Sequence, residues 1–288
     1  MLFKRIQAKG VSIFYRTAGD PKKPALLLLH GFPTASHYFR QLMPLLAKDF
    51  YCIAPDMVGF GQSESPDRRD YTYSFENETA VIAAFLEALA IDQYYLYVFD
   101  YGAPVGFRLA MAAPEKILGI ISQNGNVYEE GLGSKWQARK AYWQQPTDEG
   151  RATFAKAYDP KTIKAQYLGG EQPGTVGPDG YCLDIFYRET IADFAEKQND
   201  LILDYRSNVA AYPDFQRYLR DWQPKLLAIW GQNDPSFIWP GALAFQRDVP
   251  TAKVVALDAG HFALESQAQT IAKEILLTFT EERKRNAL

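Results

Sequence analysis

The clearest chemical signal in this sequence is a single aspartate, Asp100, at the end of an apolar run. The run Tyr94–Phe99 predicts a buried strand, and the glycine-punctuated stretch 101–106 predicts a helix directly after it. This order is typical of an elbow, a sharp strand–turn–helix bend that holds a nucleophilic side chain at the edge of a sheet. The chain has no Gly-x-Ser-x-Gly motif, so the residue at the bend is a carboxylate. A carboxylate suits attack on a saturated carbon, in an epoxide or a carbon–halogen bond, through an alkyl-ester intermediate.

Asp100 also has a simpler interpretation, because an aspartate after a strand often caps the next helix. The catalytic interpretation gains support from the histidines. The chain has three of them, His30, His37 and His261. His261 follows Gly260, between the last strand-like run and the final helical stretch, where a triad histidine belongs in the order nucleophile, acid, histidine. We therefore expect His261 to be the general base.

The acid of such a triad is expected after the strand that precedes the histidine. Asp234 lies in a turn after the apolar run 225–230. Aspartate is common in turns for structural reasons, but a triad histidine needs a carboxylate to fix its tautomer and stabilise its imidazolium. Asp234 is the predicted acid, and Glu129, after the sixth strand, is the alternative.

Two loops are expected to complete the site. The loop 30–33, His-Gly-Phe-Pro, follows the first buried parallel strand. We expect the backbone amides of Phe32 and Tyr101 to form an oxyanion hole. The histidine of the loop is expected to order it, and its proline favours a cis peptide bond in a tight turn. The turn 56–63 lacks the spacing of a phosphate-binding loop and is interpreted as shaping the pocket floor.

Strand and helix patterns alternate along most of the chain. Residues 3–10 and 11–18 alternate apolar and polar around Gly10, which predicts an antiparallel pair at a sheet edge. Further strands are predicted at 26–29, 51–55, 94–99, 118–122, 225–230 and 254–257, and helices near 35–47, 74–90, 103–113, 240–247 and 263–283. The alternation favours an α/β fold with a mostly parallel eight-stranded sheet and helices on both faces.

The alternation breaks between residues 127 and 222. This segment is rich in Trp, Tyr, Gln and Arg, and the stretch 169–180 inside it is a glycine-rich loop. We interpret 127–222 as a helical cap domain inserted into a core domain of residues 1–126 and 223–288. Such a cap would cover the carboxyl ends of the strands, where ligands bind in open α/β sheets. Its aromatic residues would line a pocket.

The composition is that of a globular protein, with 47% hydrophobic residues, a net charge of −3 and a pI near 5.7. No long basic run points to nucleic acid or an anionic membrane, and no apolar run is long enough to span a bilayer. Cys52 and Cys182 have neither metal-ligand nor disulfide spacing. The start of the chain lacks the apolar core of a signal peptide. We expect a cytoplasmic monomer or homodimer that acts on a small molecule without a metal or cofactor.

Together these motifs resemble the α/β-hydrolase superfamily, in the branch that holds epoxide hydrolases and haloalkane dehalogenases. The resemblance covers essentially the whole chain. It rests on the loop 30–33, the turn at Asp56, the elbow at Asp100, and the segments 231–234 and 260–261. It implies an α/β-hydrolase fold and an aspartate nucleophile.

Two positions depart from the dehalogenase pattern. Haloalkane dehalogenases typically carry His-Gly-Asn-Pro and Asp-Trp-Gly, whose Asn amide and Trp indole hold the halide, whereas this sequence has Phe32 and Tyr101 there. Epoxide hydrolases tolerate the phenylalanine and use cap tyrosines to protonate the epoxide oxygen. The segment 203–206, Leu-Asp-Tyr-Arg, is similar to their Trp-Tyr-Arg segment. The resemblance therefore implies that Tyr205 is a proton donor.

The second donor stays open between Tyr142 and Tyr167, and a packed structural tyrosine is the commoner alternative at each position. The first hypothesis is an epoxide hydrolase in which Asp100 forms the ester. The second is a haloalkane dehalogenase-like hydrolase with non-standard halide donors, such as the Tyr101 hydroxyl or Trp143. The third, from another class, is a non-catalytic ligand-binding protein on the same scaffold. Release of a diol, of a halide, or of neither separates the three.

Overall fold

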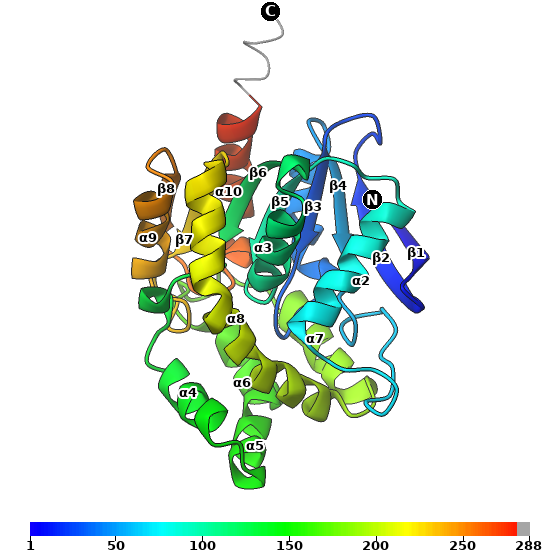
Figure 1. Cartoon of the computed structure of the whole chain (residues 1–288), viewed down its shortest axis with the longest axis vertical. Helices are drawn as coiled ribbons and strands as arrows, with labels where there is room; N and C mark the ends of the chain where they lie inside the picture. The colour runs from blue at the N-terminus through cyan, green and yellow to red at the C-terminus, as the bar shows by residue number, and fades with distance from the viewer. Residues whose placement is uncertain (281–288) are drawn as a thin grey trace, which may run out of the picture.

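The computed structural model describes residues 1–280, and an eight-stranded sheet runs through this part of the chain (Figure 1). The strands are β1 Leu2–Ala8, β2 Val11–Ala18, β3 Ala25–Leu29, β4 Tyr51–Pro55, β5 Tyr94–Phe99, β6 Ile117–Gln123, β7 Leu226–Gly231 and β8 Lys253–Leu257. Their order across the sheet is β1-β2-β4-β3-β5-β6-β7-β8. β2 is antiparallel to β1 and β4, and the other neighbours are parallel. The predicted mostly parallel sheet is confirmed.

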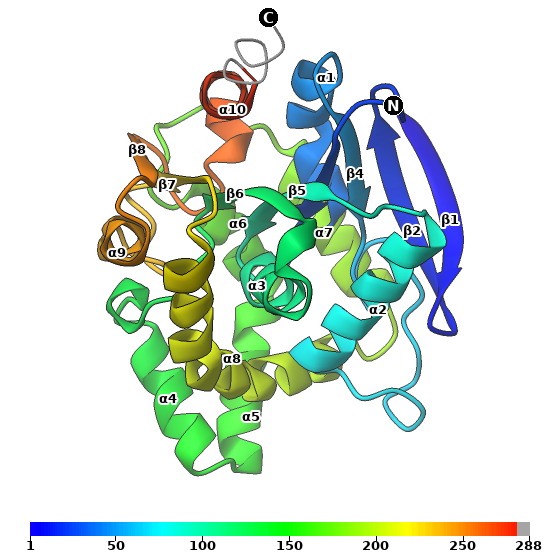
Figure 2. The same cartoon turned by 45° about the horizontal axis from the view of Figure 1, so that its top comes forward.

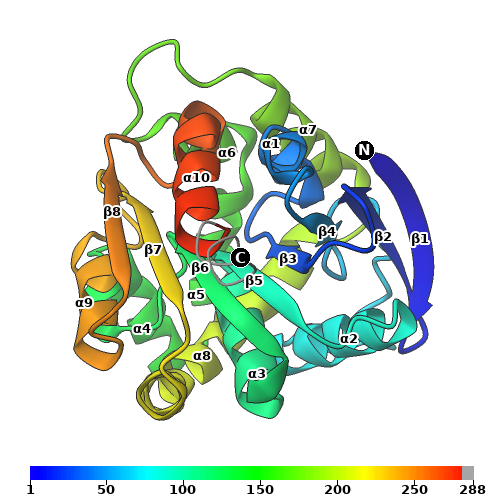
Figure 3. The same cartoon turned by 90° about the horizontal axis from the view of Figure 1, so that it is seen from above.

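Helices cover both faces of the sheet. They are η1 Ser36–Arg40, α1 Leu42–Leu46, α2 Phe75–Ala88, α3 Gly102–Ala112, η2 Pro114–Lys116, α9 Pro240–Asp248 and α10 Leu264–Phe279. Figure 3 shows α1 and α10 on one side of the sheet and α2 and α3 on the other. The core helices lie at the predicted helical stretches as far as residue 280, and residues 281–283 of the last predicted stretch lie outside the described residues.

The central strands are apolar on both faces because each face is covered. β3 and β5 are buried along their whole length, and they pair in parallel with Leu27 beside Leu96. Leu26 belongs to the hydrophobic core that α1 and α10 complete, and Leu27 belongs to the core on the side of α2 and α3. Near-continuous apolar strands are the expected sequence pattern of a parallel sheet between two helical layers.

Helices also fill the segment between β6 and β7. They are η3 Glu129–Gly131, α4 Trp136–Gln144, α5 Asp148–Ala155, η4 Lys156–Tyr158, α6 Pro160–Leu168, α7 Asp179–Thr190 and α8 Phe194–Trp222. α4 to α7 gather at one end of the sheet, and α8 runs back along the core towards β7 (Figures 1 and 2). The division into core and cap domains stays a prediction.

The longest helix, α8, has 29 residues, although the sequence pattern there is only weakly helical. Its buried positions include Lys197, Gln198, Asn199 and Asn208, so polar residues stand where an amphipathic pattern requires apolar ones. Pro213, inside the helix, weakens the sequence signal further. None of the described helices is both long and apolar enough to cross a membrane.

Candidate active site

Asp100 occupies the sharp bend between β5 and α3. Its φ of +48° lies in the left-handed region, which aspartate tolerates better than most residues. The bend leaves no room for side chains on the neighbouring loops. A Cβ on Gly31 would lie 2.3 Å from the Cβ of Asp100, and one on Gly102 would lie 2.3 Å from the Leu29 carbonyl oxygen. The glycines around Asp100 therefore allow the elbow that the sequence predicts.

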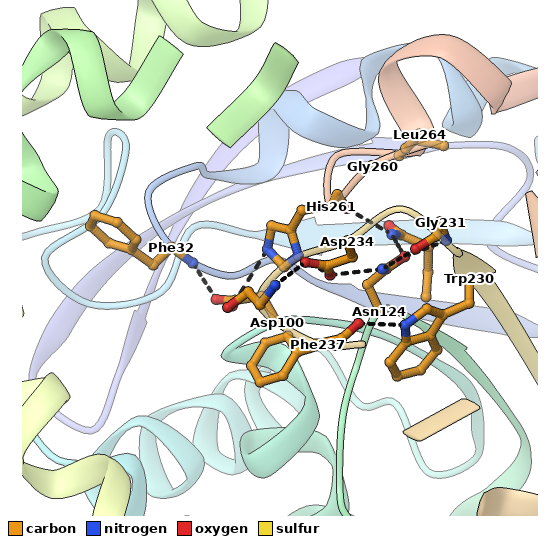
Figure 4. Close-up of polar contacts among 12 residues, drawn as sticks. Phe32, Asp100, Asn124, Trp230, Gly231, Asp234, Phe237, Gly260, His261 and Leu264 are labelled. Atoms are coloured by element: carbon orange, nitrogen blue, oxygen red, sulfur yellow. Dashed lines mark hydrogen bonds and ion pairs between the residues drawn. The ribbon is translucent and has the colours of Figure 1, made fainter. Parts of the chain in front are cut away.

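The Asp100 carboxylate is held from two sides. The backbone amide of Phe32 donates to Oδ1 at 2.7 Å, and the Nε2 of His261 lies 3.6 Å from Oδ2. Figure 4 shows the His261 ring between Asp100 and Asp234. All three side chains are buried, so their charges interact in a medium of low polarity.

Asp234 is the carboxylate that contacts His261. Its Oδ2 lies 2.6 Å from His261 Nδ1, and its Oδ1 accepts from the amide of Ser236 at 2.7 Å. Glu129, the alternative acid, is exposed and pairs with Lys140 at 2.9 Å, so it does not take this position. The structure thus brings together the three residues that the sequence singled out for a triad.

A fourth polar residue, Asn124, fixes Asp234 and was missed in the sequence. Its Nδ2 donates to Asp234 Oδ2 at 2.8 Å, and its Oδ1 accepts from the Gly231 amide at 2.9 Å. Asn124 directly follows β6 and has a φ of +45°. Two amides, Gln123 and Asn124, at the end of an otherwise apolar strand are the signal that could have indicated it.

Gly231, at the end of β7, lets the loops after β7 and β8 come close enough for this network. A Cβ on Gly231 would lie 1.8 Å from the backbone carbonyl oxygen of Gly260, which is too close for any side chain. Asp234 lies in the first of these loops and His261 in the second. Their contact at the carboxyl ends of adjacent parallel strands therefore depends on the missing side chain of Gly231.

The two carboxylates keep His261 charged. Burial lowers the pKa of His261, but the carboxylates of Asp234 and Asp100 outweigh burial and raise it to about 10. The imidazolium is therefore the resting form at neutral pH, with Nδ1–H donating to Asp234 and Nε2–H facing Asp100.

His30 orders the loop that carries Phe32, as its position predicts. Its Nε2 accepts from the Met57 amide at 2.9 Å, and its Nδ1–H donates to the Gly31 carbonyl at 3.1 Å. Burial lowers the pKa of His30, which favours this neutral tautomer. The Phe32–Pro33 peptide bond is cis, as the sequence predicted.

A cavity of about 400 Å³ opens above Asp100 and His261. Its wall is mostly apolar and comes from both the sheet edge and the inserted helices, with Phe32, Tyr101, Trp136, Tyr158 and Ile202 among the lining residues. This size and character are typical of a site for a small organic molecule. Phe32 and Tyr101, whose backbone amides are predicted to form the oxyanion hole, are among these lining residues, and that role stays a prediction.

The other aromatic residues predicted to bind substrate do not line this cavity. Tyr167 stacks on Phe262 with ring centroids 3.8 Å apart and donates its hydroxyl to Asp184. Tyr142 packs against Phe154. Tyr167 and Tyr142 are thus packing residues here, and the expectation of direct substrate contact is corrected for both.

Trp143 and Tyr205 lie behind the wall of the cavity rather than in it. The indole of Trp143 donates to the Ile202 carbonyl at 2.7 Å, so it is not free to hold a halide, and that expectation is corrected. Tyr205 is fully buried among aromatic rings, 4.5 Å from Trp136 and 5.9 Å from Tyr101 between centroids. Its hydroxyl lies 3.4 Å from that of Tyr212, and the residue does not line the cavity, so the expectation that Tyr205 donates directly to the substrate is corrected as well.

Asp234→Asn is expected to lower kcat by roughly three to four orders of magnitude, because the amide cannot stabilise the imidazolium or hold the right tautomer. Steady-state kinetics on a substrate of the wild type would measure this. Glu129→Gln, at an exposed position, is the matched control and is expected to change kcat by less than about twofold. A mild effect at Asp234 with a severe one at Glu129 would move the acid to the sixth strand.

The fold and the site together define a class: an α/β protein with an elbow aspartate, a buried histidine and a second aspartate at the carboxyl ends of its strands. Residues 24–268 match the α/β hydrolase fold family. The chain belongs to this family and is a hydrolase.

Relatives of the chain carry hydrolase names. It is 43% identical over 97% of its length to an uncharacterised hydrolase of Saccharomyces cerevisiae, of which it covers 97%. It is 34% identical to haloalkane dehalogenase 2 of Mycobacterium tuberculosis, over 89% of this chain and 88% of the relative. Its structure resembles that of haloalkane dehalogenase DbeA from Bradyrhizobium elkani, with a TM-score of 0.80, 22% identity and 99% of each chain covered. The last likeness concerns the fold.

Proposed function

We propose that this hydrolase opens an epoxide through a covalent ester on Asp100. The observation that carries the proposal is the Tyr101 hydroxyl, which is buried without a hydrogen-bond partner among residues 1–280, on a residue that lines the cavity with Asp100. Burial chiefly, and also the Asp100 carboxylate, raises the pKa of Tyr101. This hydroxyl stays protonated, so it is suited to donate to an oxygen that leaves as an alkoxide.

Ring opening needs both a nucleophile and an acid. Asp100 attacks one ring carbon, a carbon–oxygen bond of the epoxide breaks, and its electron pair stays on the ring oxygen. A tyrosine hydroxyl gives that oxygen a proton, and the imidazolium of His261 restores the proton to the tyrosinate. The ester of Asp100 then stands beside a neutral imidazole.

Alkylation itself prepares His261 for the second step. The Asp100 carboxylate is one of the two charges that raise the pKa of His261, and the ester removes that charge. The neutral imidazole takes a proton from water, which attacks the ester carbonyl, and the amides of Phe32 and Tyr101 stabilise the oxyanion. Release of the diol restores the Asp100 carboxylate and the His261 imidazolium, so protons balance over the cycle.

A second candidate is hydrolysis of a carbon–halogen bond by the same ester. It is favoured by the dehalogenase relatives and by the Tyr101 hydroxyl. This hydroxyl is buried without a hydrogen-bond partner among residues 1–280, and the residue lines the cavity. A halide leaves as a stable anion and needs only hydrogen bonds, which Tyr101 could supply where haloalkane dehalogenases have a tryptophan.

Product analysis with a panel of epoxides and haloalkanes tests the two candidates. Diol release supports the epoxide hydrolase, and halide release supports the dehalogenase-like hydrolase. Neither product, together with tight binding of the same compounds, would favour a ligand-binding protein instead.

Tyr101→Phe is expected to slow ester formation from an epoxide by roughly 10²-fold or more, the usual contribution of a general acid, and to leave ester hydrolysis nearly unchanged. The variant removes one oxygen and little volume, so the packing is preserved. Stopped-flow measurement of the two steps would show the split. Tyr205→Phe, at a position behind the cavity wall, is the matched control and should leave both steps nearly unchanged. If Tyr101→Phe leaves diol formation unchanged but removes halide release from a haloalkane, the dehalogenase candidate takes its place.

A further inference from the structure

The acidic groups of the cavity are already engaged by the protein. Asp234 accepts from His261, Asn124 and the Ser236 amide. Asp100 accepts from the Phe32 amide and faces the His261 imidazolium. Both carboxylates therefore already have partners, and neither forms an ion pair with a lysine or arginine of the cavity.

The cavity nevertheless has two more cations, Lys135 and Arg139, on its α4 side. Neither makes an ion pair within residues 1–280. The guanidinium of Arg139 lies 4.6 Å from the ring centroid of Trp136, which orients it. Its Nη1 donates only to the Lys135 carbonyl, at a long 3.4 Å, and its Nε is buried without any partner in the described chain. A partly desolvated, unpaired guanidinium costs free energy until an anion approaches.

Lys135 and Arg139 do not stabilise helix α4 by their charge. They stand at the amino-terminal end of α4, whose first turn has no acidic residue. The helix dipole disfavours positive charge at this end. Both the dipole and the two side chains therefore present positive potential to the same part of the cavity.

The positive charge of Arg139 acts on two tyrosine hydroxyls of the cavity that holds Asp100, the proposed nucleophile. Burial raises the pKa of Tyr101 and Tyr158, and the Arg139 guanidinium opposes the rise at both hydroxyls. Tyr101 directly follows Asp100, whose carboxylate acts on the same hydroxyl. The guanidinium and the carboxylate therefore belong to one small space of about 400 Å³.

We propose that the substrate carries a carboxylate that Arg139 binds, with Lys135 adding charge at the rim, while the electrophilic carbon faces Asp100. The substrate class is a short-chain carboxylic acid that bears the epoxide or the halogen. The identity of the electrophile rests on the proposed function, whereas the carboxylate site does not. An arginine suits this task because its planar donors match the two oxygens of a carboxylate.

Binding tests the site without any turnover. Isothermal titration of the wild type with butanoate and with butanamide compares a charged ligand with a neutral one of nearly the same shape. Butanoate is expected to bind about 10- to 100-fold more tightly, the range for hydrogen bonds to a charged group. Arg139→Gln should reduce this ratio to near 1, and Arg139→Lys should keep part of it.

Lys140→Gln is the matched control. Lys140 lies on the same helix, but it pairs with Glu129 and does not line the cavity, so its removal should keep the full preference. Equal binding of butanoate and butanamide to the wild type, or an unchanged ratio in a folded Arg139→Gln variant, would overturn the proposal. Thermal denaturation of each variant shows that it is folded.

Kinetics then separates this proposal from the proposed function. An epoxy acid should have a higher kcat/KM than its primary amide by a similar factor, mainly through KM. If butanoate binds preferentially but no epoxide or halide is hydrolysed, the carboxylate site stands and the proposed function fails. If neutral epoxides are hydrolysed and the acid has no advantage in binding or kcat/KM, the carboxylate site fails and the proposed function stands.

Discussion

Asp100→Asn is expected to lose turnover by roughly 10⁴-fold or more, the scale on which removal of a nucleophile acts in other hydrolases. Asparagine cannot form the ester, yet it tolerates the positive φ of this bend and can still accept from the Phe32 amide. The fold should therefore survive. Steady-state kinetics and the thermal unfolding temperature would be measured together.

The same variant changes the charge on His261. With the Asp100 carboxylate gone, burial and Asp234 remain, so the pKa of His261 should fall from its raised value of about 10. An NMR titration of the imidazole would follow the fall. Asp248→Asn removes a carboxylate that is also buried but paired with Arg220, and it should change stability without abolishing turnover. Near-normal activity of Asp100→Asn would refute the ester mechanism.

The core of the fold was predictable because its signals are local. Runs such as Tyr94–Phe99 are apolar throughout, since both faces of the strand are covered, and each run ends at a glycine or a polar residue. The order of parallel strands then places the residues after each run at one edge of the sheet. Asp100, Asp234 and His261 could be grouped for this reason alone, although their roles remain predictions.

The inserted helices could not be predicted with the same accuracy. A tyrosine in a helix faces the site or the packing interior according to how the helix is rotated, and a segment with buried polar residues hides that rotation. Tyr167 is therefore turned to Phe262 and Asp184, while Tyr158, which the sequence did not single out, lines the cavity. Arg139 was missed because charged residues on helices are usually solvated.

Asn124 shows a different limit of sequence reasoning. Its side-chain hydrogen bonds with Asp234 and Gly231 join positions more than 100 residues away in the chain. No local pattern contains such a contact, because it arises only when β6 and β7 become neighbours in the sheet. Residues that position a catalytic group from an adjacent strand therefore require the structure.

His261→Gln is expected to stop the reaction after its first half and to accumulate the alkyl ester on Asp100. The carboxylate attacks without a base, but hydrolysis of the ester needs an activated water, and glutamine does not accept its proton. Intact mass spectrometry of the variant incubated with substrate would detect the adduct, and peptide mapping would place it on Asp100. The double variant Asp100→Asn/His261→Gln is the control and should show none.

The mass of this adduct also decides between the two reactions. Ring opening adds every atom of an epoxide to the protein, so the mass rises by the full mass of the substrate. Displacement of a halide adds the alkyl group in place of a proton, so the rise is smaller by the mass of the hydrogen halide. A variant that loses turnover but forms no adduct with any substrate of the wild type would contradict the assignment of His261 to the second step. In that case the imidazolium would be required for attack by Asp100 itself, and not only to return a proton to the tyrosinate once the ring has opened.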